Sequence, residues 1–483
     1  MTVYDKLAEP LALTVFLATL CLPLLIGFLT MRLTKNQNDF FIGGRAMDKF
    51  VVALSAVSSG RSSWLILGVS GMAYLRGTGA VWAIAGYITA EMFQFIYIGK
   101  KLRTQTESFE SLTLLDYFES RFNDGKHIIR VTGAAIIALF LTAYVAAQFN
   151  AGAKSLSTAL GIPFIVSLLV SGTLILVYMV LGGYIAVAYN DVVRAVIMIV
   201  GLVIFPIYGL VKVGGPGVLL QTLEKINPAY IDPFSLGLGA IAGFLGIGLG
   251  SPGQPHIIVR YMSINDAEKL RISTVAGTIW NVILGWGAVF IGLLGRAFMP
   301  VPSKLPDGNP EMIYLVLSSK FFGPVLYGFL IGGIFAAILS TADSQLLVVA
   351  STFVRDIYEK ILRRRKPLPE EKKLSLSRIV VFLSGIIALF LAYAAKDLIF
   401  WLVLFAWGGL GASIGTSLIF SLGWKRTHKY GIVAGMVTGT LVTIFWKLFL
   451  KEPTGLYELI PAFFVSALMI VIVSLLLGTR KKN

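Results

Sequence analysis

The sequence predicts an all-α membrane protein, a single transmembrane domain over residues 1–483 with about thirteen transmembrane helices. Three observations support this fold class. The mean hydropathy is +0.81. Only 14% of the residues are charged, compared with about 25% in soluble domains. Apolar stretches of about 20 residues recur along the chain, and each is long enough to cross a bilayer.

The apolar stretches define the expected spans. They lie at 10–31, 48–75, 79–99, 129–158, 163–182, 192–212, 235–259, 274–299, 322–354, 377–395, 398–423, 428–449 and 456–478. Lys and Arg gather in alternate connections and in the last residues, at 32–49, 100–130, 260–271, 360–373, 425–429 and 480–482. Because basic loops face the cytoplasm, an odd number of spans places the N-terminus outside and the C-terminus in the cytoplasm.

Composition and motifs exclude several other classes of protein. The one cysteine, Cys21, rules out an internal disulfide, and the three histidines are too far apart in sequence to indicate a metal site. The net charge of +16 lies in alternate loops, which is a membrane topology pattern and not that of a nucleic-acid binder. The chain has neither a GxxxxGKS/T loop for ATP hydrolysis nor a TVGYG-type potassium filter.

Two shorter segments also have an expected role. The first apolar run is not followed by a small-residue cleavage site, so we expect 10–31 to be a retained span and not a signal peptide. The polar segment 104–128 is expected to form a short amphipathic helix on the cytoplasmic side.

A polar break interrupts the second span. From Ser55 to Trp64 the chain reads Ser-Ala-Val-Ser-Ser-Gly-Arg-Ser-Ser-Trp, with apolar runs on both sides. Irregular backbone at membrane depth is tolerated only where it is buried in protein or lines a cavity, and secondary transporters bind ion and substrate at such breaks. Small residues also line close helix contacts, but an intramembrane Arg61 needs a partner or a cavity. We therefore expect function to centre on this break.

The seventh span is interrupted as well. Its sequence from Gly246 to Pro255 reads Gly-Ile-Gly-Leu-Gly-Ser-Pro-Gly-Gln-Pro. Two interrupted spans in corresponding positions are typical of transporters built from inverted repeats of five plus five helices.

A second polar constellation lies in the ninth span. Ala337, Ser340, Thr341 and Ser344 recur at i, i+3, i+4 and i+7, which is one face of a helix. Sodium is a hard cation that takes oxygen ligands, and the hydroxyls of this face could complete an ion site with carbonyls of the break. Asp343 either adds a carboxylate at the same depth or lies near the cytoplasmic end. The alternative is that the hydroxyls only bond back to their own helix.

Two acidic residues have two interpretations each. Asp191 is either an ion ligand at a second site or the N-cap of a helix over 192–212. Glu91 lies in the third span with Gln94 nearby, and it either pairs with a cation such as Arg61 or hydrogen-bonds the substrate. The partner of Arg61 is therefore Glu91, Asp343 or the carboxylate of the substrate itself.

Other residues are candidates for the wall of a cavity. Tyr144, Gln148 and Asn150 lie in the fourth span. Trp407 lies in the eleventh span, where it either stacks on a substrate or packs against neighbouring helices.

Stretches along the whole chain carry motifs of one family. They are Asp39-Phe40-Phe41-Ile42-Gly43-Gly44-Arg45, Ser62-Ser63-Trp64, Leu112-Thr113-Leu114-Leu115-Asp116-Tyr117-Phe118, Gly182-Gly183-Tyr184 with Asp191, Gly253-Gln254-Pro255-His256-Ile257 with Arg260, Ser340-Thr341 with Gln345-Leu346-Leu347, Ala406-Trp407, and Gly455-Leu456-Tyr457-Glu458-Leu459-Ile460-Pro461. Together they resemble the sodium:solute symporter family, in the branch of the bacterial sodium/proline symporters. The resemblance implies the LeuT-type fold, with an extra helix at 10–31, an inverted-repeat core at 48–423 and extra helices at 428–478.

The resemblance also implies the residues of the sites. The main sodium site would use the backbone carbonyls of Ser58, Arg61 and Ala337 and the hydroxyls of Ser340 and Thr341. A second sodium site, found in some relatives, would use Asp191, Asp343 and Ser344. The residues expected around the substrate are Ser62, Glu91, Tyr144, Gln148, Ser251, Gln254 and Trp407.

The chain departs from the proline branch near these sites. Gly60 stands where the branch has a functionally important Asp, and Arg61 replaces an apolar residue. Ile247 and Ser251 replace aromatic residues that are associated with the proline pocket. An acid is thus lost and a base gained beside the expected ion site.

The sequence thus predicts a secondary active symporter of the bacterial cytoplasmic membrane and not an enzyme. It would couple inward sodium flow to the uptake of a small organic solute, an amino acid such as proline, by alternating access. The expected partners are the sodium ion, the solute and the lipid bilayer, with no nucleic acid, and a monomer is expected to suffice.

Two alternatives remain open at this point. One is a proton-coupled or sodium-independent carrier or exchanger of a small carboxylate or amino acid, in which Arg61 or Asp343 replaces an ion. The other is a membrane sensor or scaffold on a transporter fold, for which the tail after residue 478 leaves no room for a signalling domain.

Overall fold

The computed structural model describes residues 6–30, 33–34, 36–180, 183–363, 369–395 and 397–478. Within these ranges the chain is helical except for turns and one bridge between Met47 and Ile264. The predicted all-α class is confirmed. The motif residue Gly182 and the basic stretches 364–366 and 480–482 lie outside the described residues.

The helices alternate with short turns along the whole chain. The first half contains α1 (Pro10–Thr30), α2 (Gln37–Ile42), α3 (Lys49–Gly60), α4 (Ser70–Arg76), α5 (Val81–Phe93), α6 (Lys100–Ser108), α7 (Leu114–Phe122), α8 (Ile128–Leu160), α9 (Phe164–Val180), α10 (Tyr184–Ile199), α11 (Phe205–Val213) and α12 (Pro216–Ile226). The second half contains α13 (Leu238–Gly246), α14 (Pro255–Ser263), α15 (Leu270–Phe298), α16 (Ile313–Phe321), α17 (Pro324–Ser351), α18 (Glu370–Ala394), α19 (Ile399–Leu410), α20 (Thr416–Gly423), α21 (Lys429–Phe445), α22 (Lys451–Thr454) and α23 (Leu459–Gly478).

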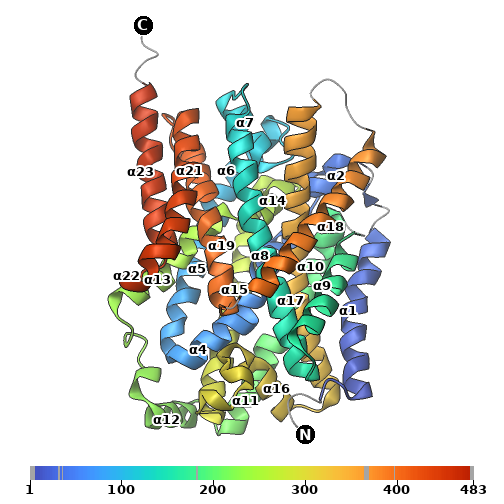
Figure 1. Ribbon diagram of the computed structural model, residues 1–483, viewed down its shortest axis with the longest axis vertical. Helices are drawn as coiled ribbons and strands as arrows, with labels where there is room; N and C mark the ends of the chain where they lie inside the picture. The colour runs from blue at the N-terminus through green and yellow to red at the C-terminus, as the bar shows by residue number, and fades with distance from the viewer. Residues whose placement is uncertain are drawn as a thin grey trace.

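Ten helical runs of the described residues are long and apolar enough to cross a membrane. Three shorter apolar helices accompany them, at Lys49–Gly60, Phe164–Leu176 and Leu238–Gly253. The run Trp64–Ser108 contains parts of two predicted spans, because the chain turns at Gly77, whose φ is 60° and ψ is −142°. In Figure 1, α1 begins near the lower edge and α23 ends at the upper edge, so the described chain starts and finishes on opposite faces.

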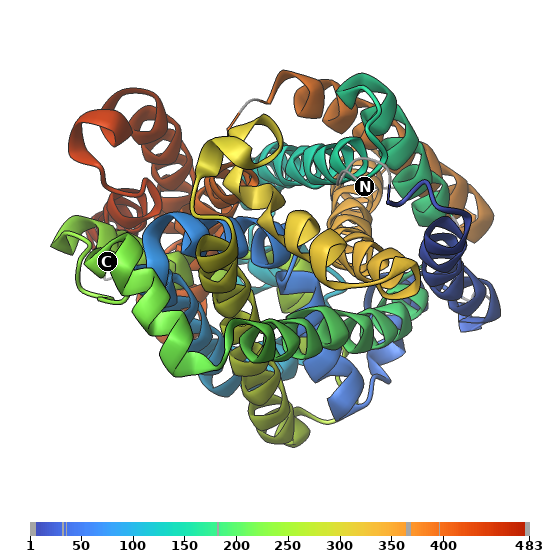
Figure 2. The ribbon, with the colours of Figure 1, turned by 90° about the horizontal axis from the view of Figure 1, so that it is seen from below.

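The terminal helices flank the rest of the bundle. Helix α1 packs against α17 and α10, and α21 packs against α23. Figure 2 shows α1 in dark blue at one edge and the C-terminal helices in red at the opposite edge. The long helices α8, α15 and α17 each contribute several buried apolar side chains to the core.

The first predicted break is present. Helix α3 ends at Gly60, Arg61 has φ −107° and ψ 65°, and a π-helical stretch begins at Trp64. The backbone N–H of Arg61 donates to the carbonyl of Ser58 at 3.1 Å, which closes a tight turn in place of the helical bond. The chain therefore leaves helical geometry at the polar residues and resumes it where the apolar residues return.

The second predicted break is present as well. A 3₁₀ stretch, Ile247–Gly253, follows α13, and Gln254 is extended with φ −93° and ψ 95° before α14 starts at Pro255. Proline has no N–H to donate, so Pro252 and Pro255 favour this interruption. Gly250 lies so close to the indole of Trp407 that a Cβ atom would clash with it.

The segment 104–128 forms two helices where one was expected. Helix α6 runs to Ser108, and α7 covers Leu114–Phe122. The apolar run of the third span continues as a helix into its basic end, because Lys100 to Ser108 contain no Gly or Pro to stop it. The prediction of a single amphipathic helix was therefore wrong in its extent.

One arginine ties α7 to two other helices at this face. The guanidinium of Arg130 on α8 lies 2.7 Å from Asp116 and 2.5 Å from Glu119, and it also contacts Asp356 beyond α17. Thr113 caps α7 by accepting from the N–H of Asp116 at 3.0 Å, and its hydroxyl donates to Asp356 at 2.9 Å. These contacts hold α7 against the start of α8 and the residues that follow α17.

The same contacts set the pKa values of the α7 carboxyl groups. Burial alone would raise the pKa of Asp116, but the charges of Arg130 and Arg355 outweigh it and hold this pKa below its ordinary value. Burial is likewise outweighed at Glu119 by hydrogen bonds from Arg130 and His127, which lower its pKa. A carboxyl group with a lowered pKa stabilises the fold above its unfolded pKa, and this contribution is lost as the pH falls through the folded-state value.

We expect Asp116→Asn to lower the free energy of unfolding by about 3 kcal/mol at neutral pH, because it removes one partner of a buried ion pair. The difference from the wild type should shrink as the pH falls below about 3.9, the ordinary pKa of Asp. Thermal unfolding in detergent at several pH values measures both effects. Glu224→Gln, at an exposed position on α12, is the control and should change little. A pH-independent difference would contradict the assignment.

Candidate functional site

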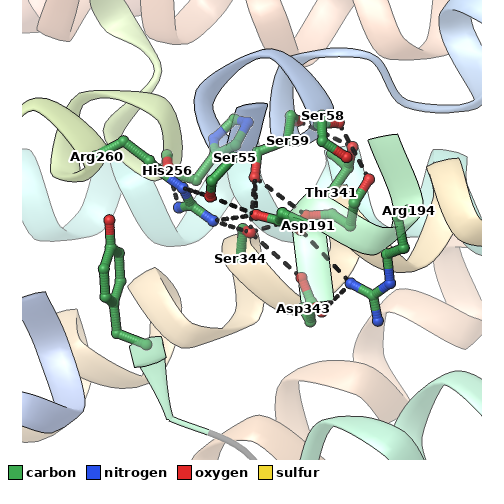
Figure 3. Close-up of polar contacts among 12 residues, drawn as sticks. Ser55, Ser58, Ser59, Asp191, Arg194, His256, Arg260, Thr341, Asp343 and Ser344 are labelled. Carbon is green, nitrogen blue, oxygen red and sulfur yellow. Dashed lines mark hydrogen bonds and ion pairs between the residues drawn. The ribbon is translucent and has the colours of Figure 1, made fainter. Parts of the chain in front are cut away.

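The end of α3 meets one face of α17 inside the protein. Ser340 Oγ lies 3.1 Å from the carbonyl oxygen of Ser58 and 3.0 Å from that of Ala337. Thr341 Oγ1 donates to the carbonyl oxygen of Ser59 at 2.9 Å. These residues are fully buried, and Figure 3 shows Ser58, Ser59 and Thr341 side by side. The hydroxyl of Ser340 reaches both helices, and that of Thr341 crosses to α3, so the face does not bond only to its own helix.

These groups form a set of uncharged oxygen atoms that fits sodium, which takes oxygen ligands. Ser340 has one hydroxyl hydrogen and two carbonyls within reach, so one of these carbonyls keeps a lone pair for a cation. Among the described residues, no hydrogen bond brings a Lys or Arg side chain to the Ser340 or Thr341 hydroxyls. The peptide of Arg61 lies beside them through its N–H bond to Ser58.

Asp191 lies inside a helix and not at its start. Helix α10 begins at Tyr184 with Gly183 as its N-cap, so the predicted N-cap role of Asp191 was wrong. The helix starts two turns before the apolar run that marked it in the sequence. Asp191 accepts instead from the hydroxyls of Ser55 at 2.7 Å and Ser59 at 3.0 Å, both on α3.

Asp191 and Ser344 form a second buried cluster with three further charged side chains, Asp343, Arg194 and Arg260, drawn in Figure 3. The carboxylate of Asp191 lies 3.1 Å from Arg260 and 3.6 Å from Arg194, and Asp343 lies 2.6 Å from Arg194. Ser344 Oγ accepts from Arg260 at 2.5 Å. The structure thus brings together the three residues predicted for a second sodium site, and it places two guanidinium groups among them.

Arg61 has a partner inside the protein. Its guanidinium lies 3.0 Å from the carboxylate of Glu91 on α5, and both side chains are at most 2% exposed. Asn281 on α15 hydrogen-bonds both of them, and the ring of Tyr87 stacks with its centroid 3.4 Å from the guanidinium carbon. Of the three partners considered from the sequence, the structure selects Glu91.

Polar side chains of α8 hold the first break. Gln148 Oε1 accepts from the backbone N–H of Ser63 at 3.2 Å and from its hydroxyl at 3.0 Å. The hydroxyls of Ser62 and Tyr144 lie 3.4 Å apart. Asn150 does not take part, because its amide donates to carbonyls at the end of α18 at 3.0 and 3.2 Å. Its predicted place in the cavity wall was wrong, since it faces the opposite side of α8.

Trp407 on α19, Gln94 just after α5 and Gln254 within the break hold the second break. Gln254 Nε2 donates to the carbonyls of Gly250 at 3.0 Å and Trp407 at 3.1 Å. The indole N–H of Trp407 donates to the carbonyl of Ile247 at 2.8 Å, and Ser251 donates to the amide oxygen of Gln94. The backbone groups freed by the interruption thus find partners within the protein.

A small cavity separates the two breaks. Its volume is about 10 Å³, room for about one water molecule. Its wall consists of Gly60, Trp64, Tyr87, Tyr144, Ile247, Val403, Leu404 and Trp407. Tyr144 and Trp407 were predicted around the substrate and line this cavity, whereas Tyr87 was missed because an aromatic residue in an apolar span carries no distinct signal. A solute enters only when this wall opens.

The sodium:solute symporter family matches residues 40–439. The chain belongs to this family. It is therefore a transporter that couples a solute to sodium, and it is not an enzyme. Both statements agree with the sequence-based prediction.

Two bacterial relatives match nearly the whole chain. The osmoregulated proline transporter of Bacillus subtilis (strain 168) is 33% identical over 456 residues, which cover 94% of this chain and 92% of that relative. The sodium/proline symporter of Escherichia coli (strain K12) is 34% identical over 472 residues, which cover 96% and 93%.

Solved structures show the same fold. A Na⁺-coupled sialic acid symporter in a substrate-bound outward-open state has a TM-score of 0.80 at 20% identity, covering 96% of this chain and 98% of that one. Mhp1, a nucleobase-cation-symport-1 family transporter in a closed conformation, has a TM-score of 0.55 at 12% identity, covering 92% and 96%. The LeuT-type fold predicted from the sequence is confirmed.

We expect Ser340→Ala/Thr341→Ala to raise the sodium concentration for half-maximal uptake about tenfold, equal to about 1.4 kcal/mol of lost binding. The reason is that two oxygen ligands would disappear from the main sodium site that the sequence predicts. Thr416→Ala/Ser417→Ala on α20 is a matched control, because these hydroxyls bond to carbonyls of their own helix region. If the double mutant folds and its sodium dependence is unchanged, the site assignment is rejected.

We expect a double-mutant cycle to detect the Arg61–Glu91 pair. Arg61→Gln or Glu91→Gln alone should destabilise the protein by about 3–5 kcal/mol, because one buried charge is left without its partner. The double variant should lose less than the sum of the two. The exposed pair Lys100–Glu268 is the control and should show coupling near zero. Additive losses at Arg61 and Glu91 would contradict the pairing.

Proposed function

We propose that this chain takes up proline, or a closely similar small amino acid, together with sodium. The observation that carries the proposal is the near full-length match to relatives named as a proline transporter and a sodium/proline symporter. The aromatic wall of the small cavity, formed in part by Trp64 and Trp407, suits the apolar part of such a solute.

We assign the main sodium site to the carbonyls of Ser58, Arg61 and Ala337 and to the hydroxyls of Ser340 and Thr341. The hydrogen bonds between α3 and α17 support this assignment. Around the solute we assign Tyr144 and Trp407 to the cavity wall, and Ser62, Gln148, Ser251 and Gln254 to the breaks on either side of it. Glu91 acts through its pair with Arg61 and not as a direct ligand.

Three cavities support transport by alternating access. A cavity of about 510 Å³ between α13, α19 and residues 451–457 shares Ile247 and Leu404 with the small central cavity. On the other side, a cavity of about 30 Å³ is lined by Arg260, Ser344 and Asp356. The three cavities are separate in this structure, and movement of the broken helices would join the central one to one side at a time.

Sodium entry drives the uptake. Ion and solute bind next to the same break, so binding of one affects the other. By thermodynamic linkage, the factor by which sodium increases the affinity for the solute equals the factor by which the solute increases the affinity for sodium. A negative cell interior adds about 2.3 kcal/mol per charge for each 100 mV. Both contributions favour movement of the solute into the cell.

We further propose the topology that the basic loops predict. The thirteen spans place the N-terminus outside and the C-terminus in the cytoplasm of a bacterial plasma membrane. The helix at 10–31 and the helices at 428–478 lie outside an inverted-repeat core at 48–423. The position of α1 and α23 at opposite edges of the bundle supports this division. One protomer contains both breaks and the cavity, which supports function as a monomer.

We expect purified protein in liposomes to accumulate radioactive proline when sodium is imposed outside. Replacing sodium by potassium should abolish the uptake, because potassium is too large for the compact oxygen site between α3 and α17. A panel of unlabelled amino acids then ranks the solutes by competition. Uptake driven by a pH gradient without sodium, or no competition by proline, would contradict the proposal.

A further inference from the structure

The buried cluster around Asp191 is electrically balanced by residues of the chain. Among the described residues it contains two carboxylates, Asp191 and Asp343, and two guanidinium groups, Arg194 and Arg260. Exposed fractions of these four side chains are at most 3%. Buried charges need such compensation, because an uncompensated one is costly inside a membrane protein.

Three donors occupy one carboxylate oxygen of Asp191, while its other oxygen makes no hydrogen bond within the described residues and lies 3.6 Å from the guanidinium of Arg194. Asp191 accepts from Ser55, Ser59 and Arg260, and Asp343 accepts from Arg194 at 2.6 Å. Figure 3 shows these bonds converging on the two carboxylates.

The hydroxyl of the predicted second site is committed as well. Ser344 Oγ donates its one hydrogen to the carbonyl of Ser340 at 2.8 Å and accepts from Arg260 at 2.5 Å. A sodium ion could use this oxygen only by displacing the guanidinium.

The two expected sodium sites therefore differ in charge. The main site consists of uncharged oxygens, so a cation there brings the first positive charge. At the second site a cation would be the third positive charge against two carboxylates. A surplus charge in a buried cluster is unfavourable. The donor set at Asp191, Asp343 and Ser344 does not fit a second sodium.

We propose that Arg194 and Arg260 take the place of a second sodium, so that this symporter binds one sodium ion per cycle. Arg194 is the fixed cation, since it lies one helical turn after Asp191 on α10 and bridges it to Asp343 on α17. Arg260 belongs to α14, the helix after the second break, and bonds the scaffold residues Asp191 and Ser344. The inference rests on the main sodium site proposed above but not on the identity of the solute.

The test is the number of sodium ions bound per purified protein in detergent without solute, measured with radioactive sodium. The wild type should bind one ion, with a Hill slope of one. Arg194→Gln leaves the cluster with one surplus negative charge, so the count should rise to two and the Hill slope should exceed one.

Two further variants make the test specific to charge. Arg194→Lys keeps the fixed cation and should leave the count at one. Arg194→Gln/Asp343→Asn removes one charge of each sign and should also leave it at one, even though the arginine is gone. Their counts separate a charge effect from general loosening of the cluster.

Three results would overturn the inference. They are a count of two in the wild type, a count of one in folded Arg194→Gln, or a count of two in the neutral double variant. A wrong assignment of the main sodium site is recognised separately. In that case the Ser340→Ala/Thr341→Ala variant would still bind as many sodium ions as the wild type.

Discussion

The interruption of helices inside a membrane protein is the constraint on which the rest of this structure depends. A backbone N–H or C=O that leaves the helical ladder must find a partner where no bulk water is present. At the first break the hydroxyls of Ser340 and Thr341 and the amide of Gln148 supply such partners. At the second break Gln254 and Trp407 do so. The helices around the two breaks therefore contribute polar side chains that satisfy the broken backbone, as well as apolar faces that pack.

Buried charge follows the same principle. Arg61, Glu91 and Asn281 form one neutral group on α5, α15 and the first break. Asp191 and Asp343 with their two arginines form another, also neutral in sum. The proposed main sodium site has uncharged oxygen atoms, and no hydrogen bond among the described residues brings a Lys or Arg side chain to its Ser340 and Thr341 hydroxyls. The arginines of the two neutral groups are paired with carboxylates, which leaves these oxygens available to a mobile cation.

Hydropathy and composition were enough to predict the all-α membrane class and both breaks, whereas the count of thirteen spans stays a prediction. These features depend on local sequence, because length and apolar content decide whether a segment crosses a membrane. The face of Ser340, Thr341 and Ser344 was also predictable from helical periodicity.

Pairings between distant helices were less accessible. Glu91 was one of three possible partners for Arg61, because a separation of 30 residues says nothing about distance in space. Asn281 and Arg194 were missed, although both lie within predicted spans. That position was their signal, because an intramembrane polar residue needs a partner. Asp191 was misplaced at a helix start, because α10 begins with Tyr184 and continues without a break through the polar residues before 192.

One side chain links the ion site to the charge cluster. Ser59 Oγ lies 3.0 Å from the carboxylate of Asp191, 3.3 Å from the carbonyl of Ser340 and 3.1 Å from the hydroxyl of Ser344. It has a single hydrogen to donate, so it can serve only one of these acceptors at a time. Asp191 also accepts from Arg260 on α14, the helix that follows the second break. Through Ser59, the hydroxyl face beside the first break therefore belongs to the same hydrogen-bond network as the second broken helix.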